Sequence, residues 1–427
     1  SVEGRQLLAL KISDNVEQNE QEAAFLYTAT MHGNEIVGIV LLLRFADLLL
    51  SSYGNDAGLT RLVDNLEIWI NPIANPDGCY SRDDDMSLAH SFRYNINEVD
   101  LNRDFPIPNK GDANDPTGRA IETQHMMNFM GQHHFAMSAN IHSGMEVVVY
   151  PWDNRNYPHV DKDWYRFVAG EYAEEAMTVD PDYMFGWPEG GIVHGYSWYQ
   201  AAGTRTDYVS YYLGGREVTL ELSEQQRLES EELERHWDIN ERSLINYMAQ
   251  ATYGIRGRIT DQDTGDPLEA RVVVLNHDTE ADRSWIYSSP DHGDYYRFLK
   301  EGVYDLRFSA GGYNSKTISN VRVVDYEPTY LDVRLQGYEV SVEDPEAPGF
   351  RIYPNPAVHT FIIEPANLPY GELELAVYTL DGKLVSVETH PYHGSGIELS
   401  ASQMEPGIYM LRCTIENYSE VKRLMVF

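Results

Sequence analysis

The side chains with the clearest chemical potential are a histidine and a carboxylate three residues apart, His32 and Glu35. Imidazole nitrogen and carboxylate oxygen both bind Zn²⁺, and a catalytic zinc site needs a third protein ligand and one open position. Two residues of these types also fall three apart by chance. The pair alone is therefore a weak signal, and a surface histidine near the start of a helix explains it equally well.

Three further groups of residues strengthen the metal-site interpretation. His142 ends an apolar run, which places it at a strand end, where ligands bind in open α/β sheets. Asp100 stands two residues before an amide side chain, Asn102, and a fixed cation, Arg103, follows directly after that amide. Glu221 lies inside an otherwise apolar strand, where a carboxylate is costly unless it is paired or functional. Together these residues favour a metal-dependent site.

The elements that must position these residues alternate between strands and helices over residues 1 to about 250. Short apolar runs predict strands, and the pattern over 36–50 predicts a helix buried on one face. The predicted strands are 23–29, 66–70, 139–142, 147–150 and 216–222. This alternation predicts an α/β catalytic domain with a mixed, mostly parallel sheet covered by helices.

The pattern changes after residue 253. Short alternating strands with Gly and Asp turns, and no helical period, predict a small all-β sandwich. Residues 337–349 are acidic and contain proline, which is typical of a linker. Residues 350–427 return to short alternating strands and predict a second small all-β sandwich.

Composition narrows the class of protein. The 427 residues include 32 Lys and Arg against 67 Asp and Glu, so the formal net charge is 32 − 67 = −35. That balance argues against nucleic-acid binding and favours attraction of basic ligands. The two cysteines, Cys79 and Cys413, lie far apart and provide neither a disulfide framework nor a Cys-type zinc site.

The start of the chain shows no targeting signal. Residues 1–5 lack the basic and apolar stretches of a signal peptide. The most apolar window, 36–50, is broken by Arg44 and Asp47 and is too short to span a bilayer. We expect a chain without a transmembrane segment that is mature or truncated at its N-terminus.

Seven segments, in order along the first domain, resemble the zinc metallocarboxypeptidases, in particular the regulatory subgroup that includes carboxypeptidases M, N, D and E. They are SVEGR (1–5), MHGNE (31–35), NPDG (75–78), DLNRDFP (100–106), IHSG (141–144), GYSWY (195–199) and EVTLELS (217–223). The resemblance covers nearly all of residues 1–251. It implies an α/β fold and peptidase activity for this domain.

The same resemblance implies roles for the residues already singled out. The implied ligands of one Zn²⁺ per chain are His32, Glu35 and His142. Asp100 would orient the first histidine by a hydrogen bond to its other nitrogen. Glu221 is implied as the general base and acid, which takes a proton from the attacking water and passes it to the leaving amine. Glu217 is the rival carboxylate, because an even separation along the strand can place both on one face.

The resemblance also implies how the substrate is held. Arg93, nine residues before Asn102, would polarise the scissile carbonyl and hold the developing oxyanion. Asn102 and Arg103 would bind the free C-terminal carboxylate of the peptide, a task that suits the planar fork of arginine. Tyr199 would be the mobile tyrosine that closes over the bound terminus.

One segment departs from the subgroup. Members specific for basic residues carry GGMQD at the pocket floor, whereas this chain has GTRTD at 203–207. We expect Thr206 at the floor, with Arg205 beside it and Asp207 as a candidate acid. Arg205 pointing inward would favour C-terminal Asp or Glu, whereas strand alternation would turn it outward. The subgroup resemblance and the acidic surface favour basic residues.

The remaining domains also resemble known modules. Residues 252–336, with GRITD at 257–261, resemble the transthyretin-like domain of the same carboxypeptidases, which implies a folding or docking role. Residues 350–427, with FRIYPNPA at 350–357 and GIYMLR at 407–412, resemble a type A sorting domain of the type IX secretion system. This implies partnership with that secretion machinery and a secreted or outer-membrane surface location in a Gram-negative bacterium.

Three functions compete at this point. The leading one is an exported zinc carboxypeptidase acting on peptides or proteins with a free C-terminus. A zinc amidohydrolase of the same fold, acting on cell-wall or acyl-amino-acid substrates, is the second, since a peptidoglycan stem also presents the carboxylate that Asn102, Arg103 and Tyr199 imply. The third is a non-catalytic surface binding protein, and the retention of the zinc ligands and Glu221 counts against it.

Overall fold

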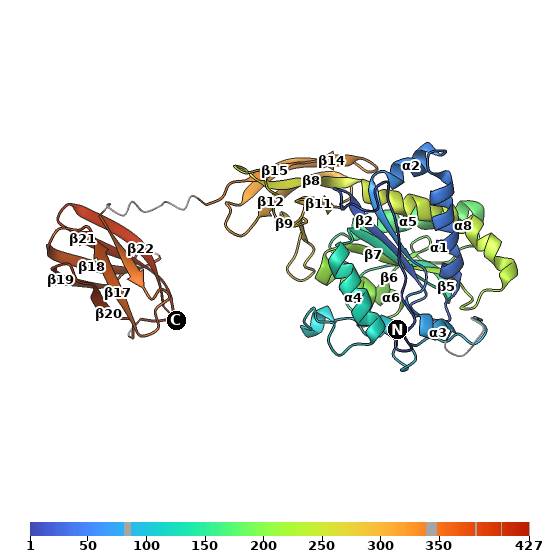
Figure 1. The fold of residues 1–427 in the computed structure, drawn as a ribbon, viewed down its shortest axis with the longest axis horizontal. Coiled ribbons are helices and arrows are strands. Elements are labelled where there is room, and N and C mark those ends of the chain that lie inside the picture. The colour runs from blue at the N-terminus through green and yellow to red at the C-terminus, as the bar shows by residue number, and fades with distance from the viewer. Residues whose placement is uncertain (81–86, 339–347, 381, 403, 427) are drawn as a thin grey trace. The chain divides into compact units, whose positions relative to one another are not determined.

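The computed structural model describes residues 1–80, 87–338, 348–380, 382–402 and 404–426. The chain forms two compact units, residues 1–338 and residues 339–427 (Figure 1). The segment predicted to be a linker, 337–349, lies largely outside the described residues.

A seven-stranded sheet forms the centre of the first unit, in the order β1-β3-β2-β4-β7-β5-β6. The strands are β1 (Leu10–Ile12), β2 (Ala23–Ala29), β3 (Leu66–Asn71), β4 (Met137–His142), β5 (Met145–Tyr150), β6 (Ile192–His194) and β7 (Arg216–Ser223). Strand β1 is antiparallel to β3, and β5 is antiparallel to β7, whereas the other four neighbouring pairs are parallel. The prediction of a mixed, mostly parallel sheet is confirmed.

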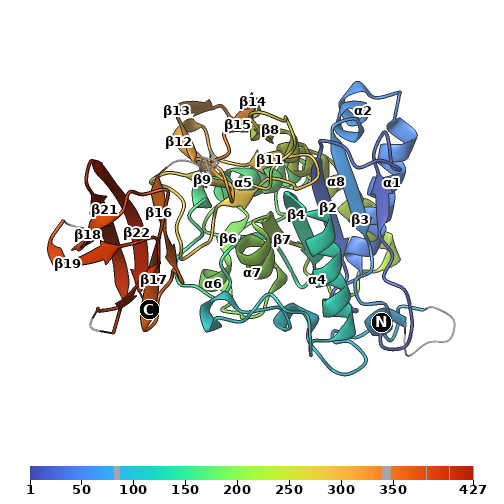
Figure 2. The same ribbon diagram turned by 60° about the vertical axis from the view of Figure 1, so that its left-hand side comes forward.

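Helices cover both faces of this sheet (Figure 2). One face packs against α1 (Val37–Ser52), α5 (Lys162–Val179) and α8 (Leu233–Ala249), and the other against α4 (Ile121–His133) and α7 (Arg205–Tyr208). The shorter helices are α2 (Ala57–Val63), α3 (Pro76–Tyr80) and α6 (Gly195–Trp198). In β2, Phe25 and Tyr27 belong to the apolar core on the side of α1, α5 and α8, while Ala24 and Leu26 belong to the core on the side of α4 and α7. A strand covered on both faces is apolar throughout, which explains the unbroken run in the sequence.

Among the described residues, no single helix is both long and apolar enough to cross a bilayer. Helices α1 and α2 meet that length and composition only when taken together, and they are bent by 106° at their junction.

The C-terminal part of the first unit, from residue 254 onward, is all-β, as predicted. Its strands are β8 (Gly254–Asp261), β9 (Arg271–Val274), β10 (Ile286–Tyr287), β11 (Asp294–Arg297), β12 (Gly302–Ser309), β13 (Lys316–Val323), β14 (Pro328–Tyr330) and β15 (Val333–Leu335). They form sheets in the orders β10-β9-β12-β13 and β11-β8-β14, with β15 also paired to β8, around one apolar core. This sandwich packs on the helical layer, where Phe298 stacks on Trp164 of α5 with ring centroids 5.4 Å apart.

The C-terminal unit is a separate sandwich with its own core, which includes Cys413. Its strands are β16 (Gly349–Tyr353), β17 (Thr360–Ala366), β18 (Gly371–Thr379), β19 (Leu384–Tyr392), β20 (Ile397–Ser400), β21 (Gly407–Ile415) and β22 (Tyr418–Val426). They form a three-stranded sheet, β16-β17-β20, and a four-stranded sheet, β19-β18-β21-β22. The predicted fold class, an α/β domain followed by two all-β sandwiches, is confirmed.

Candidate active site

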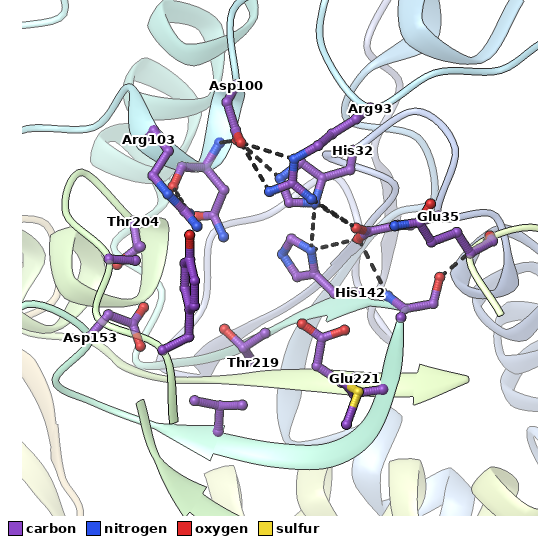
Figure 3. A pocket seen from close by; sticks show the side chains of 18 of the residues that line it. His32, Glu35, Arg93, Asp100, Arg103, His142, Asp153, Thr204, Thr219 and Glu221 are labelled. Atoms are coloured by element: carbon purple, nitrogen blue, oxygen red, sulfur yellow. Dashed lines mark hydrogen bonds and ion pairs between the residues drawn. The ribbon is translucent and has the colours of Figure 1, made fainter. Parts of the chain in front are cut away.

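Three metal-binding side chains converge at the carboxyl ends of β2 and β4 (Figure 3). Nδ1 of His32 lies 2.8 Å from Oε1 of Glu35, and Nδ1 of His142 lies 2.7 Å from Oε2 of Glu35 and 3.1 Å from Nδ1 of His32. A tetrahedral Zn²⁺ with bonds of about 2.0–2.1 Å separates its ligand atoms by about 3.3 Å. These buried donors therefore fit one zinc ion in type, number and spacing.

The local fold explains why residues 110 positions apart meet. Strands β2 and β4 are parallel neighbours with Ala29 opposite Ile141, so their carboxyl ends lie at the same edge of the sheet. The loop after β2 packs tightly against the next loop at this edge. A Cβ on Gly33 would lie 2.3 Å from the carbonyl carbon of Gly78, so only glycine allows this approach.

Asp100 and Arg93 brace the metal-binding group (Figure 3). Nε2 of His32 lies 3.1 Å from Oδ1 of Asp100, a bond that orients the ring so that Nδ1 faces the metal position. Arg93 donates from Nε to Oδ2 of Asp100, at 3.0 Å, and from Nη1 to Oε1 of Glu35, at 3.4 Å. Burial raises the pKa of Glu35, but the two histidines outweigh it and hold this pKa well below its usual range. Glu35 is therefore ionised, as a metal ligand must be.

Glu221 lies beside this group on β7, directly across from His142 in the strand register. It lines the same cavity, and burial together with the Glu35 carboxylate raises its pKa well above the usual range. That shift suits a group whose task is to accept a proton. The rival carboxylate, Glu217, is fully buried away from the cavity and pairs with Arg205, with Oε2 and Nη2 2.7 Å apart.

An amide and a guanidinium lie across the cavity from Glu221, on the 3₁₀ turn Leu101–Arg103. Asn102 is fixed at both ends: its N–H donates to Oδ1 of Asp100 at 3.0 Å, and its Oδ1 accepts from the N–H of Arg205 at 2.9 Å. Among the described residues, no acceptor is bonded to the side-chain amide nitrogen of Asn102, which can donate to a substrate. The guanidinium of Arg103 lies 5.7 Å from the ring centre of Tyr199, which is 62% exposed. Tyr199 thus stands at the cavity mouth with room to move.

The cavity encloses about 480 Å³. Its lining includes most of the residues predicted for the site, which are His32, Glu35, Arg93, Asp100, Asn102, Arg103, His142, Tyr199 and Glu221. It also includes residues that the sequence did not single out, among them Asp153, Thr204 and Thr219. Residues from six separate segments therefore share one cavity.

The expected position of Arg205, Thr206 and Asp207 is corrected, because none of these side chains lines the cavity. Arg205 is fully buried against Glu217, and Thr206 Oγ1 lies 2.9 Å from Thr219 Oγ1. Asp207 is fully buried, and its carboxylate accepts hydrogen bonds from the backbone N–H groups of Asp153 and Asn154. Strand alternation does not apply to this segment, because it starts the helix α7 and is not a strand. From the segment 203–207, it is Thr204, the residue just before α7, that lines the cavity.

Asp153 is the acidic residue among those that sequence reasoning missed. Its carboxylate lines the cavity near Thr204 (Figure 3), and burial raises its pKa to about 6. Among the described residues it forms no ion pair with a cation. A Cβ on Gly195 would lie 1.9 Å from Oδ1 of Asp153, so this glycine makes room for the carboxylate. The available signal was an acid three residues beyond the end of β5.

Comparison with known proteins gives the site a family. Residues 1–243 match the family described as zinc carboxypeptidase, residues 254–336 the carboxypeptidase regulatory-like domain, and residues 351–427 the secretion system C-terminal sorting domain. The first match covers more than half of the chain. This protein therefore belongs to the zinc carboxypeptidase family, and the resemblance of all three domains is confirmed.

Individual relatives agree with that assignment. Carboxypeptidase SOL1 of Arabidopsis thaliana is 36% identical over 330 residues, covering 74% of this chain and 63% of that protein. Carboxypeptidase D of Homo sapiens is 35% identical over 342 residues, covering 76% of this chain and 24% of that protein. Carboxypeptidase M of Mus musculus is 31% identical over 391 residues, covering 86% of each. The chain thus spans under two thirds of the first two relatives and most of the third.

Proposed function

We propose that this chain is an exported zinc-dependent carboxypeptidase that removes the C-terminal residue of peptides or proteins. One arrangement carries the proposal. Three metal-binding side chains, a buried carboxylate at Glu221 and an amide–guanidinium pair at Asn102 and Arg103 surround a single cavity. The pair suits a free carboxylate, and the other groups suit hydrolysis of the amide bond next to it.

The substrate is held at two points on either side of the bond that breaks. Asn102 and Arg103 bind the α-carboxylate of the last residue through charge-assisted hydrogen bonds. The Arg93 guanidinium, hydrogen-bonded to Asp100, faces the carbonyl oxygen and stabilises the negative charge that develops there. Tyr199 closes over the bound terminus from the cavity mouth.

Glu221 transfers the proton. As the oxygen of the attacking water adds to the carbonyl carbon, Glu221 accepts a proton from that water, and it donates this proton to the nitrogen as the carbon–nitrogen bond breaks. His32, Glu35 and His142 would hold a zinc ion that, when bound, acidifies water and polarises the carbonyl. The products are a shortened peptide and a free amino acid.

A basic C-terminal side chain is the proposed preference. A residue held by Arg103 would extend its side chain toward Asp153, Thr204 and Thr219 in the same cavity. Asp153 is buried and forms no ion pair with a cation among the described residues, so a substrate cation is the partner that would satisfy it. The buried pair of Arg205 and Glu217 removes the repulsion expected from a cation in the pocket.

Export rests on the C-terminal unit. Its similarity to secretion system sorting domains supports delivery through the type IX secretion machinery of a Gram-negative cell, to the cell surface or the medium. We propose that machinery as its second partner, beside the peptide substrates.

The decisive experiment compares peptides that differ only at the C-terminus. The purified, zinc-loaded chain should release arginine from a peptide ending in free arginine and leave its C-terminal amide intact, because the amide removes the charge that Arg103 binds. Acyl-amino acids and a peptidoglycan stem peptide form the second arm. Equal hydrolysis of the free and amidated peptides would contradict the proposal, and faster turnover of the second arm would favour the amidohydrolase.

A further inference from the structure

A loop of the β-sandwich between β9 and β10 lies against the catalytic segment that carries Asp153. Oδ1 of Asp282, on this loop, accepts from Nη1 of Arg155 at 2.8 Å, and its Oδ2 accepts from the N–H of Val160 at 3.0 Å. The carbonyl of Ala281 accepts from the same Nη1 at 2.6 Å. The sandwich thus holds the catalytic segment at two points, five residues apart.

The ion pair between Arg155 and Asp282 is buried from solvent. The Arg155 and Asp282 side chains are each only 4% exposed. The guanidinium of Arg155 also lies over the rings of Trp152 and Tyr211, 4.4 Å and 5.2 Å from their centres. A buried cation that loses its carboxylate becomes strongly unfavourable, so Arg155 must move if Asp282 is removed.

Asp153 sits between this contact and a second one from the catalytic domain. Its N–H donates to Oδ1 of Asp207 at 2.9 Å, and the N–H of Asn154 donates to Oδ2 at 3.1 Å. Arg155 lies two residues after Asp153, and its guanidinium contacts the ring of Trp152, the residue that precedes Asp153. The backbone of Asp153 is therefore held by Asp207 and by the N–H of Ala201, which donates to the Asp153 carbonyl at 3.1 Å, and the sandwich holds Arg155 two residues further along.

We infer that Asp282 of the β-sandwich is a positioning residue for substrate specificity. It acts through Arg155, and it keeps the Asp153 carboxylate where a basic C-terminal side chain ends. This inference rests on the proposed function. It assigns to the second domain a part in selecting the substrate and leaves the metal-binding residues and Glu221 untouched.

The test measures the ratio of kcat/KM for two peptides that differ only in a final arginine or alanine. In full-length, zinc-loaded Asp282→Ala, we expect the arginine-to-alanine ratio to fall at least about fivefold through a higher KM for the arginine peptide, since small misplacements of a binding group cost up to about 10²-fold. The alanine peptide should keep its kcat/KM within about twofold. A merely structural role would lower both peptides together.

Two further variants guard against misfolding. Asp282→Asn keeps the shape of the side chain and one acceptor oxygen, and Arg155→Met removes the same ion pair from the catalytic side. Lys300→Met is the matched control, because Lys300 makes another sandwich contact, 4.4 Å from the ring of Phe167 on α5, away from Asp153. The control should keep the wild-type ratio.

The outcomes separate the two proposals. A lowered ratio in the folded Asp282 and Arg155 variants, with the Lys300 control unchanged, supports the inference. An unchanged ratio, or equal losses on both peptides, overturns it and leaves the proposed function standing. A wild-type enzyme with no preference for arginine would overturn the proposed specificity, and this inference with it.

Discussion

The sharpest prediction concerns Asp153, because one atom change there should separate substrate selection from catalysis. Replacing Asp153 by Asn keeps the volume and one acceptor oxygen but removes the charge. The carboxylate is 9% exposed and lines the cavity away from the metal-binding residues. The substitution should therefore weaken the hold on a basic side chain while the groups that break the bond stay in place.

The magnitude follows from the burial of the carboxylate. A hydrogen bond to a charged group contributes about 1.5–3 kcal/mol, and the buried position of Asp153 reduces screening by water. Since about 1.4 kcal/mol corresponds to a tenfold change in rate, kcat/KM for an arginine peptide should fall by about 10- to 150-fold. For an alanine peptide, which makes no ion pair in the pocket, the change should stay within about threefold.

The assay compares matched peptides ending in Arg, Lys, Ala and Glu under identical conditions, with zinc content measured for each preparation. Glu17→Gln is the control, because Glu17 is exposed and does not line the cavity, so the substitution removes one acidic charge out of a net −35 and tests general electrostatic attraction alone. Its profile should match the wild type. If Asp153→Asn kept the preference for arginine, or lost activity equally on every peptide, Asp153 would not be the specificity residue.

The other predictions concern the metal, the base and pH. His142→Ala should reduce bound zinc from about one per chain to near zero by elemental analysis, and full retention would exclude this ligand. Glu221→Gln should keep the zinc and lose about 10²–10⁴ in kcat, and near-normal turnover would place the base elsewhere. Because the pKa of Asp153 is raised to about 6, lowering the pH from 8 to 5 protonates it and should lower the arginine-to-alanine ratio. A ratio that stayed level across this range, or that fell equally in Asp153→Asn, would contradict this assignment.

The candidate metal ligands could be predicted from the sequence because their positions depend on local features, namely strand ends and the turns that follow them. His32 and Glu35 share one turn after a buried strand, and His142 ends another apolar strand. In a sheet whose strands run mostly parallel, such ends meet at one edge. Glu221 could be identified as a site residue because an ionisable side chain in an apolar strand demands a reason.

The residues proposed to determine specificity could not be identified in this way. The segment 203–207 offered no local sign that α7 begins at Arg205, and the helix turns Arg205 toward Glu217 and away from the cavity. Asp153 depends on the direction of β5, which is antiparallel to β7, and on the space left by Gly195. Contacts between distant segments decide both, and local residue patterns do not reveal such contacts.

The charges along the cavity support the proposed preference for a C-terminal basic residue. Such a residue carries an anion and a cation, and the cavity offers Arg103 to the first and Asp153 to the second. These two protein groups already interact, since Arg103 opposes the rise in the pKa of Asp153 that burial causes. Removing the charge of either one therefore changes the electrostatic environment of the other, so the losses in kcat/KM for an arginine peptide from Arg103→Gln and from Asp153→Asn should not be additive. Non-additive losses would show that recognition of the α-carboxylate and recognition of the basic side chain are energetically coupled.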